Sequence, residues 1–183
     1  MSSKKMTGWL ASAAASAAVV LTAGCGADSA GGTVPEGWGT LKTSAVTVAH
    51  PPAFTPQSAD GRSKYNAAAA TLSEGGKDIG MITVQLDFTN ADSVEEAAIG
   101  AEAGIALGST LQEQREIQVA GPDGTEEARR IDFEFTEKGS RIKGVIIAGL
   151  DSAEKAYAVR VDAAKGKLSD GDLKKIIDSI TVR

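Results

Sequence analysis

Two side chains that each occur once, Cys25 and His50, are the most reactive groups in the sequence. A protein zinc site needs three or four nitrogen or sulfur ligands, and one histidine with one cysteine cannot supply them. A Ser-His-Asp triad could use His50, but the chain has no Gly-x-Ser-x-Gly motif around a nucleophile. His50 precedes Pro51-Pro52, which end a strand, so we expect it in a surface loop. The sequence predicts a non-enzymatic protein without a metal site, and a hydrolase that pairs His50 with a carboxylate is the alternative.

The acidic residues offer little catalytic chemistry. Asp170-Gly171-Asp172 lacks the alternating oxygen ligands and the terminal glutamate of a calcium loop, and helix capping explains it better. Glu126-Glu127 are neighbours on a predicted strand, so their side chains point to opposite faces and form a poor acid/base pair. The chain has no phosphate-binding glycine loop and no dinucleotide fingerprint. We therefore predict no cofactor.

Cys25 stands at the end of a segment typical of export. Lys4 and Lys5 precede an apolar, small-residue run over 6–23, which closes with Leu21-Thr22-Ala23-Gly24-Cys25. This resembles a bacterial lipobox, in which signal peptidase cuts between Gly24 and Cys25 and a diacylglyceryl group, with acyl chains such as palmitate, is attached to the thiol. The position three before the cysteine is Thr22, where Leu is usual. An ordinary secreted protein cleaved near Ala23 or Ala27 is the alternative.

The length of the chain is typical of one domain, and its charge limits what that domain can bind. The chain has 183 residues with a formal charge of −5, and loss of Lys4 and Lys5 leaves 24 acidic against 17 basic residues, or −7. An acidic protein repels both nucleic acid and anionic lipid headgroups, so attachment to the membrane must come from something other than basic residues, and we expect the lipid on Cys25 to provide it. We predict a lipoprotein signal peptide at 1–24, a flexible Gly/Ala/Ser-rich tether at 25–37 and one folded domain at 38–183.

The folded part reads as strands with two helices. Alternating apolar residues predict strands near 45–49, 82–89, 130–135 and 157–161, with less regular strands at 117–119 and 142–148. The turns on either side of 65–72 predict another strand there, and a helix, which its four alanines favour, is the alternative. Turn residues fall at 121–124, 138–140 and 151–154. Ser93 and Ser169 begin the predicted helices, the first with a capping box to Glu96. The second helix carries an apolar stripe that includes Leu173 and Ile177.

Glycines recur every fourth residue on the first predicted helix, at Gly100, Gly104 and Gly108. A membrane dimer is excluded because glutamates on the same helix would be costly in lipid. We expect this stripe to let the helix approach a sheet closely, and a peptide or ligand lying along it is the alternative.

The order of elements resembles the PsbP-like fold of exported proteins, including actinobacterial lipoproteins of the LpqN type. The resemblance rests on the opening strand and proline-aromatic turn (45–54), the helix capped by Ser93, and the closing strand–helix–strand unit (157–183). The alanine- and glycine-rich composition also resembles that of actinobacterial proteins. The resemblance implies a single α+β domain, with an antiparallel sheet flanked by helices, in a family of accessory or binding modules.

These observations predict a lipoprotein on the extracytoplasmic face of a bacterial cell membrane, where it binds a protein or a small hydrophobic ligand. The candidate contacts are Trp38, His50 and Phe54, which could form a groove with the glycine stripe at Gly100, Gly104 and Gly108. The alternatives are the cell-envelope hydrolase using His50 and a structural or assembly subunit.

Overall fold

The computed structural model describes residues 32–105 and 107–183. The predicted signal peptide, Cys25 and the first part of the tether lie outside the described residues. Among the described residues, no helix is long and apolar enough to cross a membrane.

The described chain forms ten strands and two helices. Their bounds, in chain order, are β1 (Gly39–Lys42), β2 (Val46–His50), β3 (Phe54–Pro56), β4 (Ala68–Glu74), β5 (Lys77–Leu86), α1 (Val94–Ala103), β6 (Thr110–Gly121), β7 (Gly124–Glu137), β8 (Ser140–Leu150), β9 (Ala156–Ala164), α2 (Asp170–Asp178) and β10 (Thr181–Val182).

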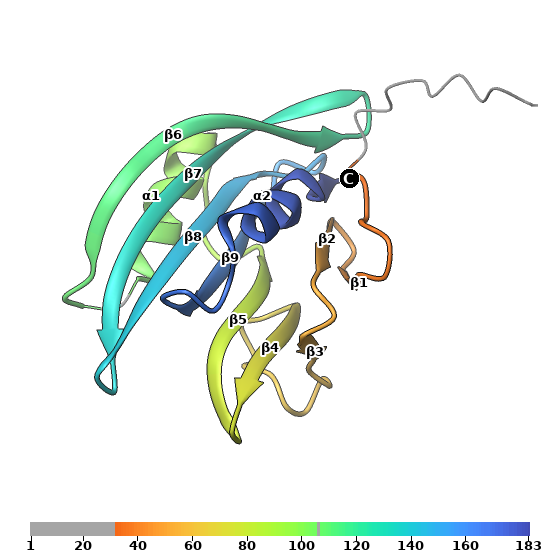
Figure 1. Cartoon of the computed structure of the whole chain (residues 1–183). Helices are drawn as coiled ribbons and strands as arrows, with labels where there is room; N and C mark the ends of the chain where they lie inside the picture. The colour runs from red at the N-terminus through yellow and green to blue at the C-terminus, as the bar shows by residue number, and fades with distance from the viewer. Residues whose placement is uncertain (1–31, 106) are drawn as a thin grey trace, which may run out of the picture.

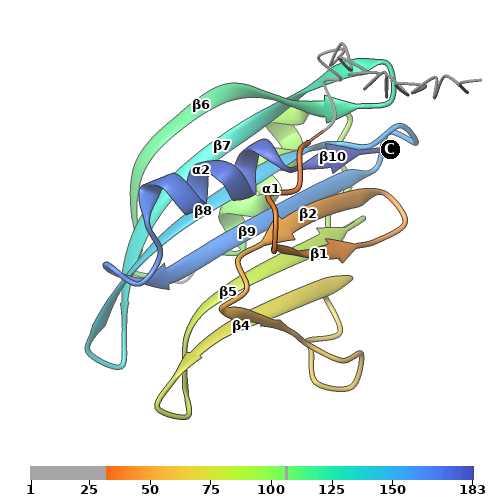
Figure 2. The ribbon, with the colours of Figure 1, turned by 45° about the vertical axis from the view of Figure 1, so that its right-hand side comes forward.

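All ten strands belong to one sheet in the order β1-β2-β10-β6-β7-β8-β9-β5-β4-β3. Neighbouring strands run antiparallel except β10 and β6, which are parallel. The sheet curves so strongly that it is nearly closed and barrel-like, and β1 approaches β4 near its two edges. Figures 1 and 2 show β6 arching along one border of this sheet, with only the short β10 beside its end.

Each helix covers a different face of the sheet (Figure 1). The inner face packs against α2 and holds the larger core, to which Leu173, Ile176 and Ile180 contribute. The outer face packs against α1, where Ala98 and Ala101 meet Ile131 and Phe133. Small side chains on α1 let this short helix lie close to the sheet.

The predicted fold class, an α+β domain with helices flanking an antiparallel sheet, is wrong. Strands make up 51 % of the structure, and only two helices of ten and nine residues occur among the described residues. The sheet curls until it is nearly closed instead of forming a flat layer between helices, and its β10–β6 pair is parallel. The prediction failed because β6 begins at Thr110 with a run of polar residues that shows no alternation.

Both predicted helix starts are confirmed. The hydroxyl of Ser93 accepts a hydrogen bond from the Glu96 N–H (3.2 Å), and that of Ser169 accepts one from the Asp172 N–H (3.0 Å). The Glu96 carboxylate accepts from the N–H of Asp92 (2.8 Å), one residue before the cap. These bonds satisfy N–H groups that a helix start leaves free.

The predicted glycine stripe does not form, because α1 ends at Ala103. Gly104 is the C-cap, and Gly108 lies beyond the helix with a φ of +87°. Gly100 alone is within the helix, and it faces the preceding loop: a Cβ there would lie 2.6 Å from Cγ2 of Thr89. Close approach to a sheet is therefore not the reason for these glycines.

Candidate functional site

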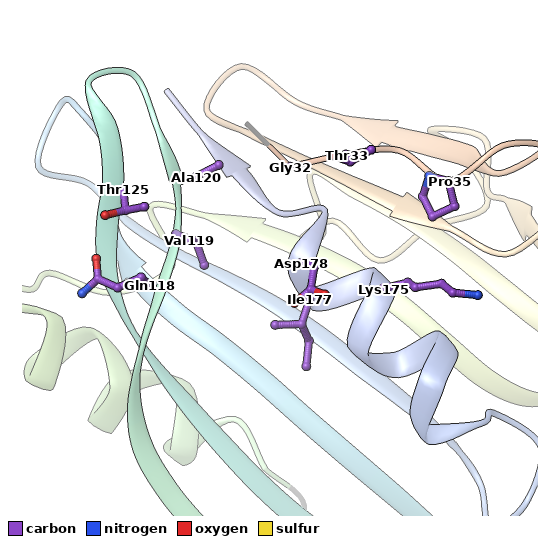
Figure 3. A pocket seen from close by; sticks show the side chains of 10 residues that line it. All are labelled: Gly32, Thr33, Pro35, Gln118, Val119, Ala120, Thr125, Lys175, Ile177 and Asp178. Atoms are coloured by element: carbon purple, nitrogen blue, oxygen red, sulfur yellow. The ribbon is translucent and has the colours of Figure 1, made fainter. Parts of the chain in front are cut away.

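A groove runs between α2 and the border strand β6. It consists of two cavities of about 580 and about 470 Å³, and both are lined by Gln118, Ile177 and Asp178. Figure 3 shows the larger cavity, with Gln118 and Val119 on β6 opposite Ile177 at the end of α2. We refer to the two cavities together as the α2–β6 groove.

Aliphatic side chains form the floor of the α2–β6 groove. Alternation along β6 turns Ile117 and Val119 towards the inner face, where they join the larger core. On α2, Leu173 and Ile177 lie one helical turn apart and face the same groove. Ile117 and Ile177 are only partly buried, so they offer alkyl surface to an occupant.

Charged side chains line the rest of the groove, and each cation there has a carboxylate partner. Arg130 on β7 makes a two-pronged interaction with Asp132, both hydrogen bonds being 2.7 Å long. Lys143 pairs with Asp170 (3.0 Å) and Lys175 with Asp172 (3.3 Å). The remaining pairs are Arg115–Glu113 (3.1 Å) and Lys174–Asp178 (2.5 Å). These pairs leave the groove without a strong excess of positive charge.

The N-terminal segment closes one end of the groove. Gly32, Thr33 and Pro35 line the larger cavity (Figure 3). Gly32 lies so close to the backbone of Ser179 that a Cβ would overlap the Ser179 carbonyl. Ser179 is itself buried, and its hydroxyl accepts from the Ala49 N–H (2.8 Å) and donates to the Ile176 carbonyl (2.6 Å). Part of the predicted tether thus packs against the end of α2.

The predicted contact residues are not brought together around this groove. Phe54 is buried in the larger core, and Trp38 packs against the same core with Lys175 over its ring, 5.6 Å from the centroid. Gly100 lies in α1 and Gly104 is the C-cap of that helix, on the opposite face of the sheet. Because the two groups lie on opposite faces of the sheet, they do not border a common groove in the part of the chain that the structure describes.

The expectation of a surface loop for His50 is wrong. His50 is the last residue of β2 and is 4 % exposed, because its ring packs over Gly39 on the neighbouring strand. Its Nδ1 lies 3.0 Å from the Pro51 carbonyl, and a carbonyl can only accept, so Nδ1 carries the hydrogen. Nε2 is buried without a hydrogen-bond partner among the described residues. The carboxylate pairing that the hydrolase alternative needs is not formed in this part of the chain.

Three exposed carboxylates gather on the outer side of β6. Oxygens of Glu95, Glu116 and Glu127 lie within 4.8 Å of one another. Arg129 makes ion pairs with Glu95 and with Glu116, the second at 3.1 Å. The hydrogen bond from Arg129 lowers the pKa of Glu95. One guanidinium against three carboxylates leaves this cluster with an excess of negative charge beside the edge of β6.

Sequence reasoning missed the residues that form the groove. Ile177 was assigned to the apolar stripe of its helix, and Gln118 lies in a strand whose length the pattern understated. Nothing in the local sequence marks Gln118, because its place at the border of the sheet depends on the order of distant strands.

No protein-family model and no curated protein matches this sequence. Among solved structures, the yeast Ran-binding protein Mog1p is similar, with a TM-score of 0.52, 10 % identity, and coverage of 79 % of this chain and 95 % of Mog1p. At such identity the likeness concerns the fold alone.

Two further structures match less well. A Bacteroides thetaiotaomicron protein has a TM-score of 0.45 and 11 % identity over 75 % of this chain, which covers only 45 % of that protein's length. A Pseudomonas aeruginosa protein of unknown function, PA94, has a TM-score of 0.35 and 13 % identity over 75 % of this chain and 86 % of its own.

Proposed function

We propose that this protein is a lipid-anchored binding module on the extracytoplasmic face of a bacterial membrane, and that it holds another molecule in the α2–β6 groove. The observation that carries the proposal is the continuity of the groove: two cavities of about 580 and about 470 Å³ have Gln118, Ile177 and Asp178 in common and an aliphatic floor. A concave site that offers apolar surface together with polar groups is a common form of binding site, and here charged pairs surround the aliphatic floor.

The anchor of the proposed module is the thiol of Cys25. It stands directly after two small residues and an apolar export segment, and it has no other cysteine to pair with. Each methylene buried in the bilayer contributes ~0.8 kcal/mol, so the acyl chains of a diacylglyceryl group hold a protein at a membrane without a spanning helix.

The anchor and the groove are close in the chain. Gly32, which lines the end of the groove, follows Cys25 by seven positions, with six residues between them. Fully extended, seven residues reach at most about 25 Å. An anchored protein therefore keeps this end of the groove near the membrane surface, where it meets membrane proteins and molecules that leave the bilayer.

Binding agrees better than catalysis with the residues present. The groove is lined by alkyl groups and by cations that already have carboxylate partners. His50, the residue on which a hydrolase would depend, is not among the residues that line it.

Native mass spectrometry of the acylated protein, processed to begin at Cys25 and extracted in mild detergent, tests the proposal. We expect wild type to carry a bound molecule and Ile177→Trp to lose it, because the indole fills the groove. Ile99→Trp is the matched control, since Ile99 is exposed on α1 at the other face. Empty wild-type protein, or an Ile177→Trp variant that keeps the bound molecule, would contradict the proposal.

A further inference from the structure

β6 is paired on one side only over most of its length. Its partner β7 runs beside it from Gly121 back to Thr110. On the other side the register gives a single pair, Ala120 with Thr181 of β10. A register irregularity lies between Leu111 and Glu113. The segment 113–119 therefore has a free edge, and this edge borders the α2–β6 groove.

The unpaired backbone groups of this edge can be assigned. Gly121 and Gly124 flank a two-residue hairpin turn and therefore exchange hydrogen bonds with each other. Hydrogen-bonded pairs alternate along an antiparallel ladder, so the backbone groups of residues 119, 117 and 115 also bond to β7. The backbone N–H and C=O groups of the residues between them point away from β7. The Ala120 N–H confirms the alternation, because it donates outward to the Ile180 carbonyl (3.3 Å). The N–H and C=O groups of Gln114, Glu116 and Gln118 thus point away from β7. They make no backbone hydrogen bond on that side with any residue the structure describes.

Free edges are usually protected against pairing with other chains. Here Glu113, Arg115 and Glu116 place charges along the strand, and the irregularity at 112 interrupts it. These features limit uncontrolled aggregation. They do not cover the edge between 113 and 119, where the neighbouring element is α2, with cavities between the two.

We propose that an extended peptide segment of a partner protein occupies the groove by adding as a strand to the free edge of β6. This inference rests on the proposed function and names its occupant. The open segment spans seven residues, which correspond to ~24 Å of strand. Main-chain hydrogen bonds to Gln114, Glu116 and Gln118 would provide affinity, as in other cases of strand addition.

The two sides of the added strand would meet different surroundings. Alternate side chains on the groove side would contact Ile117 and Ile177, which favours aliphatic residues. Side chains on the outer side would lie beside Glu116, where three carboxylates share one arginine, which favours lysine or arginine. The fitting segment therefore alternates aliphatic and cationic or polar residues.

The same charges argue against a second copy of this chain at the edge. Two β6 strands paired with each other would bring two of these acidic clusters together, and like charges facing across a strand pair are destabilising. A small amphiphile could occupy the groove but could not pair with the strand edge.

The test uses the acylated protein that begins at Cys25, in detergent, and a labelled seven-residue peptide in which valine alternates with lysine and threonine. Two further peptides carry N-methyl groups, one on the valines only and the other on the remaining residues only. Because alternate N–H groups of a strand point to the same edge, each peptide has the hydrogen-bond donors of one of its two edges blocked. By fluorescence anisotropy, we expect one methylated peptide to bind at least about tenfold more weakly and the other to bind within about threefold of the parent. Equal affinities of all three peptides, or no binding of the parent, would overturn the inference.

A variant on the protein side tests the same edge. Gln118→Pro removes an outward N–H but no bond to β7, so the fold is expected to persist, whereas Gln118→Ala keeps the N–H. We expect Gln118→Pro alone to lose the parent peptide. A wild-type dimer that Gln118→Pro abolishes, seen by light scattering, would instead assign the edge to a second copy and overturn the inference. If the peptides fail while Ile177→Trp still expels a bound molecule, this inference is wrong and the proposed function stands; if wild type binds nothing, both are wrong.

Discussion

Gln118 of β6 and Ile177 of α2 lie on opposite sides of one groove, because each lines both of its cavities (Figure 3). One contributes an unpaired strand edge and the other an alkyl side chain. An occupant that uses both must present main-chain groups on one side and apolar side chains on another, which an extended peptide does.

The proposed membrane anchor depends on one atom, the sulfur of Cys25. We predict that Cys25→Ala moves the protein from the membrane fraction to the soluble extracytoplasmic fraction, because the acyl chains can no longer be attached. Fractionation with detergent-phase partitioning measures this, and the intact mass of the wild type should include a diacylglyceryl group. A wild-type mass without that group, or unchanged fractionation of the variant, would refute the anchor.

Tyr157 carries a hydroxyl that is buried without a hydrogen-bond partner in the described part of the chain. An unsatisfied buried polar group costs stability, so Tyr157→Phe should raise the free energy of unfolding by ~1 kcal/mol at neutral pH. Urea denaturation measures this. A clearly less stable variant would show that the hydroxyl has a partner, such as a buried water.

The same residue predicts a loss of stability in alkali. Burial raises the pKa of Tyr157. Above pH ~10 the tyrosine of the unfolded chain ionises while the folded one does not, so the unfolded state releases the proton and stability falls as pH rises. We expect Tyr157→Phe to reduce the slope of unfolding free energy against pH between about pH 9 and 11. Identical slopes in both proteins would exclude this residue as a source.

Two helical glycines should respond oppositely to alanine. Gly171 has open space, with Oγ of Ser169 3.9 Å from a Cβ, so Gly171→Ala should stabilise the protein by ~0.5 kcal/mol. At Gly100 a Cβ would lie 2.6 Å from Thr89, so Gly100→Ala should lower the melting temperature. Thermal unfolding of the two variants checks both signs, and a stabilised Gly100→Ala would show that the 87–93 loop moves freely.

The parts of the fold that sequence reasoning captured are those set by local chemistry. The hydroxyls of Ser93 and Ser169 begin helices, and the turn at Lys138-Gly139 has positive φ at both residues, as a tight hairpin turn requires. The bounds of the strand predicted at 45–49 agree with those of β2 to within one residue, and the turn predicted at 121–124 ends where β7 begins. In each case neighbouring residues determine the backbone.

The parts that it missed depend on distant contacts. The first half of β6, from Thr110 to Glu116, is exposed on both faces, so it shows no alternation that could predict a strand. His50 is buried only because β1 supplies Gly39 beside its ring. The groove exists because β10 is only two residues long and leaves most of β6 without a strand partner on the side away from β7. No local pattern specifies that strand order.

Photo-cross-linking in intact cells tests the central claim most directly. A benzophenone side chain replaces Ile117, which faces the groove, in the membrane-anchored protein, and a second protein carries it at Ile99, which is exposed on the other face. We predict that irradiation gives an adduct of one defined mass from position 117, that Ile177→Trp suppresses it, and that position 99 does not give it. The same adduct from both positions, or none from position 117 in protein shown to be acylated and anchored, would contradict a binding site in the groove.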